Sequence, residues 1–184
     1  MINNKPWDFF CNGGRVFFGG SCINCSTPFY TLGIVKSSIT LLYLATQRVG
    51  APIIVKVVGS QWYWNYEVSD IEGLFFSSYI KRVEDLGVGQ IRFLEVDNRF
   101  VLPLILVQVN ITSSDVIHSF ALPSLGVKAD ATAGVLNVLN TLIYKAGNHR
   151  GQCSEICGMN HRYMPIFVEA VPITHFLFLA YIII

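Results

Sequence analysis

Short runs of β-branched and aromatic residues, separated by glycine, aspartate and asparagine, fill the chain from Ala51 onward. Runs of this length and composition are typical of strands in an antiparallel β-sandwich or barrel. In the run 61–67 the side chains alternate, so that Trp62, Trp64 and Tyr66 would share one face of a strand. We therefore expect a mainly β domain with strands at 53–58, 61–68, 91–97, 101–110, 116–122, 135–142 and 166–171.

The composition favours a protein that hides part of its surface. The chain has 184 residues, of which 52% are hydrophobic and 14% charged, whereas soluble proteins carry roughly 25% charged residues. A membrane or a large assembly would cover such a surface, and a free soluble enzyme is disfavoured. Residues 1–60 carry a net charge of +4 and residues 61–120 a net charge of −4. Because the acidic stretch is also the aromatic-rich one, no nucleic-acid partner is expected.

Neither end of the chain holds an uninterrupted run of about 20 strongly apolar residues. Residues 30–46 contain one charge, Lys36, and predict a membrane-embedded or membrane-packed helix, the alternative being a helix buried in protein. The tail after Pro172 is too short to span a bilayer, so it predicts an apolar helix that lies on a neighbour or on the membrane interface. No cleavable signal peptide is visible. The expected organisation is an N-terminal extension (1–50), a β domain (51–172) and an apolar tail (173–184).

Four side chains with soft or imidazole donors lie within twelve residues, namely Cys153, Cys157, His161 and Met164. Their spacing also fits one face of a helix packed into a core. However, glycines and a proline interrupt the segment 151–166 and predicted strands flank it, which favours a loop. A loop does not need such donors for stability. We therefore expect a metal site.

The donor types favour copper. Structural zinc sites use cysteine and histidine, whereas a thioether beside them selects copper. A single blue-copper ion uses one cysteine, so the second thiolate favours two bridged copper ions, which need a second imidazole. Of His118, His149 and His175, only His118 stands at a predicted strand and can reach the loop in a sandwich. The backbone carbonyl of Glu155 can supply a further axial donor.

Five segments of the chain resemble subunit II of cytochrome c oxidase in order and spacing. They are QWYWNYE, LEVDNR, DVIHSF, PSLGVKAD and GQCSEICGMNHRYMP, and the resemblance covers about residues 51–172. It implies a cupredoxin-like Greek-key β-barrel or sandwich that carries a binuclear copper centre, Cu-A. The implied Cu-A ligands are the bridging thiolates of Cys153 and Cys157, the imidazoles of His118 and His161, the thioether of Met164 and the backbone carbonyl of Glu155.

The resemblance also implies a function. Cu-A accepts electrons from cytochrome c and passes them to the haem and copper centres of subunit I, which reduce oxygen to water and pump protons. Electrons would enter at Trp62, for which a packed strand face is the alternative interpretation. The acidic stretch 61–120 would steer a basic carrier. The Glu155 side chain would hold a magnesium ion shared with subunit I.

The expected location is the mitochondrial inner membrane, with the copper domain facing the intermembrane space. The lack of a signal or lipidation motif favours it over a bacterial plasma membrane. The family has two membrane helices before its copper domain, and only residues 30–46 resemble the end of the second. A naturally short chain, or a separate polypeptide that supplies the first helix, would explain this difference.

Other departures from the family pattern leave the copper ligands intact. Phe120 replaces a common tryptophan and Ser114 an acid, while residues 132–135 and 149–150 also differ. Cys11, Cys22 and Cys25 lie outside the resemblance and are expected to be free thiols.

Three rival interpretations remain at this point. A quinol oxidase subunit II lacks the copper ligands, and nitrous oxide reductase has a longer chain with a histidine-rich domain. A copper-delivery or storage module, or a zinc-binding one, would use the same cysteines but would not need the aromatic motif at Trp62.

Overall fold

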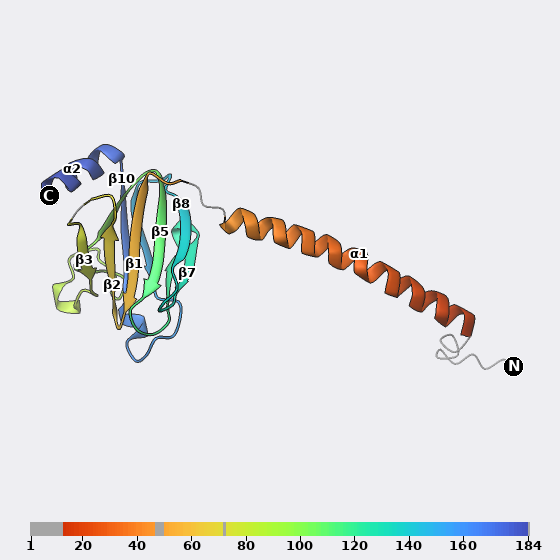
Figure 1. Cartoon of the computed structure of the whole chain (residues 1–184). Coiled ribbons are helices and arrows are strands. Elements are labelled where there is room, and N and C mark those ends of the chain that lie inside the picture. Colours follow the sequence, from red (N-terminus) through yellow and green to blue (C-terminus); the bar gives the residue numbers. More distant parts are fainter. Residues whose placement is uncertain (1–12, 47–49, 72, 184) are drawn as a thin grey trace. The chain divides into compact units, whose positions relative to one another are not determined.

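The computed structural model describes residues 13–46, 50–71 and 73–183, which form two compact units, Met1–Gln47 and Arg48–Ile184 (Figure 1). The first unit contains the helix α1 (Gly13–Thr46), which includes the helix predicted over 30–46. Hydroxyl groups of this helix donate to carbonyls one turn back, as from Ser37 to Gly33 at 3.0 Å and from Thr40 to Lys36 at 2.9 Å. None of the helices in the described ranges is long and apolar enough to cross a membrane. Cys11, and the side chains of Cys22 and Cys25, lie outside what the structure describes.

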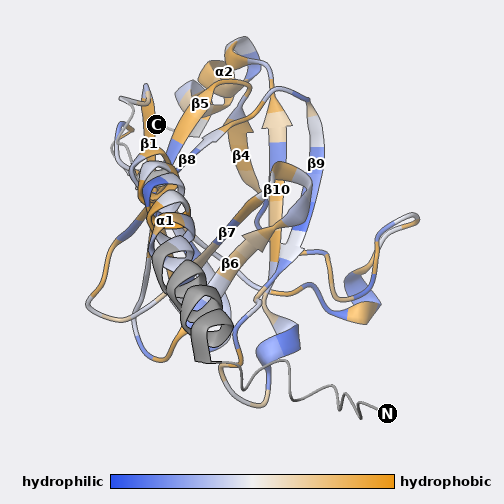
Figure 2. Ribbon diagram, turned by 90° about the vertical axis from the view of Figure 1, so that its right-hand side faces the viewer, coloured by the Kyte–Doolittle hydropathy of each residue, from blue (hydrophilic) through white to orange (hydrophobic). Residues whose placement is uncertain are grey.

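The second unit is a β-sandwich in which sheets of five and three strands enclose the core, with a two-stranded ribbon beside them (Figures 1 and 2). The order is β3-β2-β1-β5-β8 in the large sheet, β4-β10-β9 in the small one and β6-β7 in the ribbon. The strands are β1 (Ile53–Ser60), β2 (Tyr63–Val68), β3 (Phe75–Ser78), β4 (Phe100–Pro103), β5 (Leu106–Ser113), β6 (His118–Leu122), β7 (Val127–Ala131), β8 (Asn137–Leu142), β9 (Gly147–Gln152) and β10 (Pro165–Val171).

The prediction of a purely antiparallel sandwich is wrong for two strand pairs. β1 pairs with β5, and β4 with β10, in parallel. After β3 the chain crosses to the small sheet, where it forms β4. It then crosses back to the large sheet, where β5 runs parallel to β1. Such a crossover is what parallel pairing requires.

The core forms because buried and more exposed side chains alternate along the strands. β1 buries Val55 and Val57, and β5 buries every second side chain in the pattern that a half-covered strand predicts. Tyr66 of β2 stacks on Phe100 of β4, with ring centroids 4.5 Å apart, and so joins the two sheets. Burial of such large apolar side chains is the main stabilising term.

Four predicted strands, 53–58, 116–122, 135–142 and 166–171, correspond to β1, β6, β8 and β10. The prediction of one strand over 101–110 is wrong, because the chain leaves the small sheet after Pro103, which has no N–H to continue the ladder. The prediction of a strand over 91–97 is also wrong, since only Val96 forms a bridge there, with Ile80, and Phe93 has a φ of +68°. The strands β3, β7 and β9 were not predicted.

The strand predicted over 61–68 is present, but it begins two residues later than predicted. β2 starts at Tyr63, so Trp62 lies in the turn before it and not on the strand face with Trp64 and Tyr66. Those two side chains are fully buried, whereas Trp62 is only half-buried. The three aromatic residues therefore do not form one packed stripe.

The apolar tail is a helix, α2 (Ile173–Ile183), that follows directly after β10. It packs on β4 of its own domain and buries Phe176 and Ala180. The predicted apolar helix is therefore present, with one face buried on its own domain, and its contact with a neighbour or with the membrane interface stays a prediction. Leu177, Phe178, Tyr181 and Ile182 of the same helix remain exposed.

Close approach of β6 and β9 makes Gly151 a sensitive position. A Cβ atom there would lie 1.9 Å from the carbonyl oxygen of Ala121, so Gly151→Ala must push the two strands apart. We expect it to lower the free energy of unfolding by about 3 kcal/mol, the upper end for overpacking. Urea unfolding measures this. Gly87→Ala, whose Cβ would meet only Gln90 at ordinary contact distance, serves as the control, and an equal loss in both variants would contradict the packing argument.

Candidate metal centre

Two segments of the β domain bring the predicted ligands to one place. His118 is the first residue of β6, and the loop 153–164 connects β9 to β10. The backbone N–H of Ser154 donates to the carbonyl of Ser119 at 3.1 Å, which holds this loop beside the start of β6. Apart from the short helical turn η4 (His161–Tyr163), the segment is irregular, so the predicted loop is confirmed and the helix is excluded.

The sulfur atoms of the loop lie close together. Cys153 Sγ is 3.9 Å from Cys157 Sγ, which in turn is 3.5 Å from Met164 Sδ and 3.6 Å from His161 Nδ1. Cys153 Sγ also lies 3.3 Å from the carbonyl oxygen of Glu155. Both thiols and the thioether are buried. All four predicted donors of the loop therefore converge, together with the predicted backbone carbonyl.

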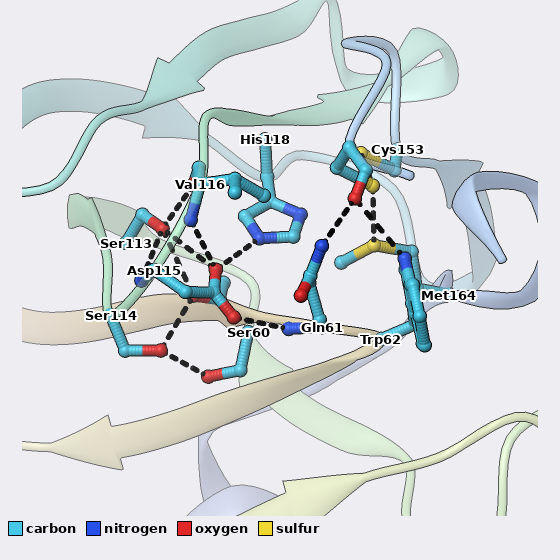
Figure 3. Close-up of polar contacts among 12 residues, drawn as sticks. Ser60, Gln61, Trp62, Ser113, Ser114, Asp115, Val116, His118, Cys153 and Met164 are labelled. Carbon is cyan, nitrogen blue, oxygen red and sulfur yellow. Dashed lines mark hydrogen bonds and ion pairs between the residues drawn. The ribbon is translucent and has the colours of Figure 1, made fainter. Parts of the chain in front are cut away.

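His118 completes the cluster, because its ring nitrogen and the two cysteine sulfurs lie within 4.8 Å of one another. Its Nε2 atom forms a 2.8 Å hydrogen bond with Asp115 Oδ1 (Figure 3). Its buried Nδ1 atom has no hydrogen-bond partner among the residues that the structure describes. A carboxylate that accepts from Nε2–H leaves a lone pair on Nδ1, as in histidines that bind metals. The donor set and this unpaired nitrogen fit a thiolate-bound copper pair.

The ionisation of the metal-free cluster follows from its packing. Burial opposes the thiolate of Cys153, but the neighbouring His118 ring and the backbone at Glu155 and Ser119 favour it and lower its pKa to about 7. Burial and the neighbouring Cys153 raise the pKa of Cys157 to about 12. Burial also opposes the imidazolium of His118, yet Cys153 and Asp115 outweigh it and raise its pKa. The cluster thus keeps protons that a bound metal would displace.

Residues 61 and 62 touch the cluster from a third side, in the turn between β1 and β2. The side chains of Gln61 and Trp62 both donate to the carbonyl oxygen of Cys157, at 2.8 Å and 3.2 Å (Figure 3). The backbone N–H of Gln61 donates to Asp115 Oδ2 at 2.7 Å. Gln61 therefore joins the loop before β6, which carries Asp115, to the loop that carries the cysteines.

Two glycines make room for these contacts. A Cβ atom at Gly158 would lie 3.1 Å from the Trp62 ring, and its φ of +120° also disfavours other residues. A Cβ atom at Gly59 would lie 3.0 Å from the rings of both His118 and Trp64. Trp64 in turn donates from its indole nitrogen to the carbonyl of Met164 at 3.2 Å. The surroundings of the ligands are thus closely packed.

Sequence reasoning missed Gln61, Asp115 and Trp64 as supporting residues. Gln61 and Trp64 flank Trp62 in the motif QWYW, and Asp115 stands three residues before His118. Their nearness in the sequence to the predicted site residues Trp62 and His118 is the signal that could have revealed them. The other candidate imidazoles lie elsewhere: His149 is hydrogen-bonded to Ser124 at 2.9 Å, and His175 is on α2.

Several acids of the stretch 61–120 are engaged in other contacts. Glu67 pairs with Lys56 at 3.2 Å, and Asp70 accepts from the backbone N–H of Ile54 at 2.8 Å. Glu95 is buried and pairs with Arg150 at 2.7 Å. Asp115 is the acid that contacts the cluster among the described residues of that stretch.

Loss of the Asp115 carboxylate should weaken metal binding. In Asp115→Asn the amide can donate to His118 Nε2, which moves the ring proton to Nδ1 and blocks the lone pair. We expect about 10- to 100-fold lower copper affinity, the usual effect of removing such a partner. Titration of the full chain against a competing chelator measures it. Asp85→Asn, which removes an exposed ion pair with Arg82, should bind as the unmodified chain does, and unchanged affinity in Asp115→Asn would contradict this role.

Comparison with known proteins shows the family to which the chain belongs. Residues 53–171 match the family of the cytochrome c oxidase subunit II periplasmic domain. Cytochrome c oxidase subunit 2 of Cyanidium caldarium is 50% identical over 146 residues, which are 76% of this chain and 57% of that protein. The protein of the same name from Phytophthora megasperma is 49% identical over 152 residues, 79% of this chain and 57% of the relative. The chain thus spans 57% of the length of these relatives.

Solved structures show the same fold. The periplasmic domain of subunit II of cytochrome oxidase from Bradyrhizobium japonicum is 39% identical, with a TM-score of 0.68 over 74% of this chain and 96% of that one. Subunit II of cytochrome c oxidase in a mixed disulfide intermediate with a thioredoxin-like protein is 34% identical, with a TM-score of 0.65 over 75% and 94% of the two chains. These likenesses confirm the mainly β, cupredoxin-like prediction. The chain belongs to the cytochrome c oxidase subunit II family.

Proposed function

We propose that this chain is the subunit of a cytochrome c oxidase that receives electrons from cytochrome c at a Cu-A centre. It passes them to the haem and copper centres of subunit I, where oxygen is reduced to water and protons are pumped. One observation carries the proposal: two buried thiols and the unpaired Nδ1 of His118 converge within 4.8 Å in a chain of this family.

Six residues would hold the copper pair. Cys153 and Cys157 would bridge it, His118 and His161 would each bind one ion, and Met164 and the carbonyl of Glu155 would be the weak axial ligands. When bound, the pair supplies one-electron redox chemistry. The chain holds these donors in a buried, hydrogen-bonded setting, so they need little rearrangement when the charge changes.

Trp62 is the proposed point where electrons enter. Its ring is half-buried, and its indole N–H donates to the carbonyl of the ligand residue Cys157 at 3.2 Å. A carrier that touches the ring is therefore one hydrogen bond from the ligand loop. Gln61 donates to the same carbonyl, and Gly158 leaves room for the ring.

The remaining partners follow from membership of an oxidase. The Glu155 carboxylate is proposed to bind a magnesium ion shared with subunit I, because this residue is only half-buried while its carbonyl turns to Cys153. The apolar side chains of α1 between 29 and 44 are exposed and are proposed to lie against the membrane or other oxidase subunits. The proposed location is the mitochondrial inner membrane, with the copper domain in the intermembrane space.

A copper-delivery or storage module is the second candidate. It would need the same cysteines, but it would have no use for a tryptophan bonded to the ligand loop. The contact from Trp62 to Cys157 therefore favours electron transfer.

Removal of one bridging thiol should abolish the pair. We expect the full chain to bind two copper ions and Cys157→Ser to bind at most one, because a single thiolate cannot bridge two ions in the same way. Metal analysis after gel filtration measures the ratio. Cys11→Ser, which changes a cysteine outside the β domain, should retain two ions. Two ions in Cys157→Ser would refute the bridging assignment.

Loss of the Trp62 ring should slow electron entry without loss of copper. We expect Trp62→Gln to reduce the rate of reduction by cytochrome c about tenfold or more, since tryptophan side chains are typical anchors of interfaces. Stopped-flow absorbance measures the rate, and a small chemical reductant should act on both proteins alike. Tyr144→Gln, which removes an exposed aromatic ring in the loop after β8, is the control. An unchanged rate in Trp62→Gln would favour the delivery or storage module.

A further inference from the structure

Two exposed arginines near the ligand loop have no acidic partner. Arg162 directly follows the predicted ligand His161, and Arg92 lies between β3 and β4 in the chain. The ion pairs that arginines form among the described residues belong to three others, Arg82, Arg99 and Arg150. Arg92 and Arg162 are therefore positive charges without a counterion in the part of the chain that the structure describes.

Both guanidinium groups lie against one aromatic ring. The centre of the Phe93 ring is 4.5 Å from the Cζ atom of Arg92 and 5.1 Å from that of Arg162. The same ring meets the Tyr163 ring edge to face, with centroids 5.5 Å apart. A guanidinium that contacts a ring through its flat face keeps the N–H donors at its edge. The Phe93 ring thus gathers two cations and leaves their donors available.

The backbone fixes this ring in place. Phe93 has a φ of +68°, which bulky residues rarely adopt. Its carbonyl accepts from the side chain of Gln152 at 3.3 Å. Such a conformation persists only where surrounding contacts hold it. We call Arg92, Phe93, Arg162 and Tyr163 the arginine cluster, and because it is formed in the chain alone, it loses little entropy when a partner binds.

The charge of the arginine cluster selects among the partners of an oxidase subunit. The planar fork of a guanidinium matches a carboxylate, to which it donates two parallel hydrogen bonds. A basic electron carrier, which the acidic stretch 61–120 would attract, is repelled by two unpaired arginines. The arginine cluster therefore fits an acidic protein surface and not the carrier.

The place of the arginine cluster agrees with a partner other than the carrier. Trp62, the proposed entry point, precedes β2 of the large sheet and donates to the carbonyl of Cys157. Arg162 is next to His161, in the turn that precedes β10 of the small sheet. The two surfaces thus approach the metal centre through different ligand residues and from different sheets. A donor at one surface and an acceptor at the other need not compete for the same contact.

We propose that the arginine cluster binds a carboxylate group of subunit I, the membrane subunit that accepts electrons from the copper pair. The proposal rests on the proposed function, because it requires an oxidase that contains such a subunit. Binding of the carboxylate at Arg92 and Arg162 orients the β domain on subunit I. The same two charges keep the basic carrier away from this contact.

Carbodiimide cross-linking in the assembled oxidase tests the proposal. The reagent joins an amine to a carboxylate with which it is in contact, and it does not join a guanidinium. Arg162→Lys and Arg92→Lys each keep the positive charge and supply an amine. We expect a cross-linked peptide, absent from the unmodified enzyme, that joins position 162 or 92 to an aspartate or glutamate of subunit I. Mass spectrometry identifies it.

Two results would overturn the proposal. One is the absence of this peptide from both variants, and the other is a peptide that joins position 162 or 92 to added cytochrome c. Arg82→Lys is the control, because Arg82 is exposed and its partner Asp85 belongs to the same chain. It should give a link within the chain. A link from position 82 to subunit I, as frequent as the link from position 162, would also contradict the proposal.

Reversal of the charge should weaken the assembly. We expect the double variant Arg92→Glu, Arg162→Glu to retain about tenfold less subunit I when the full chain is captured from detergent-solubilised membranes, because like charges at an interface repel each other. Arg82→Glu should retain as much as the unmodified chain. Equal retention by the double variant would contradict the proposal. Copper content verifies that each variant is folded, and cross-linking decides the matter if the double variant takes up no copper.

The same experiments separate this proposal from the proposed function. An assembled enzyme with two copper ions per chain, but with no cross-link from either lysine variant, would refute the role of the arginine cluster alone. A chain that is cross-linked to subunit I at position 162 or 92, but binds no copper pair, would refute the proposed electron-transfer function alone.

Discussion

Two hydrogen bonds of Gln61 hold together the loops on which the metal centre depends. Its backbone N–H binds Asp115, which fixes His118, and its side chain binds the carbonyl of Cys157. These loops come from different parts of the sandwich, and without a link the donors would have to be gathered when the metal binds. A set of donors that is already in place loses less entropy on binding and rearranges less on electron transfer.

Close packing adds to this constraint. Gly59 and Gly158 let aromatic rings approach the ligands to distances that a side chain would prevent, and Gly151 lets β9 approach β6. Trp64, buried between the sheets, contacts both the His118 ring and the carbonyl of Met164. The centre is therefore part of the hydrophobic core, so stability and ligand geometry depend on the same contacts. Of the two thiols, Cys153 has the lower pKa because its neighbours favour the thiolate, and burial together with that neighbouring charge raises the pKa of Cys157.

The ligand loop was predictable because its information is local. Four donors, helix-breaking residues and flanking strands lie within 151–166, and the family motifs there are specific. The strand pairing was not, since parallel partners such as β1 and β5 are set by contacts distant in sequence. The strand β9 (GNHRGQ) escaped prediction because its polar residues give no apolar alternation. The roles of Gln61 and Asp115 depend on tertiary contacts, which only the structure could reveal.

In the proposed centre the two thiolates bridge a pair of copper ions that share one electron. Electron paramagnetic resonance of the oxidised, copper-loaded full chain tests it most directly, with the metal content measured on the same sample. We expect two copper ions per chain and one unpaired electron spread equally over both. A spectrum of isolated copper ions, or zinc in place of copper, would contradict it and would mean that the cysteines serve another purpose.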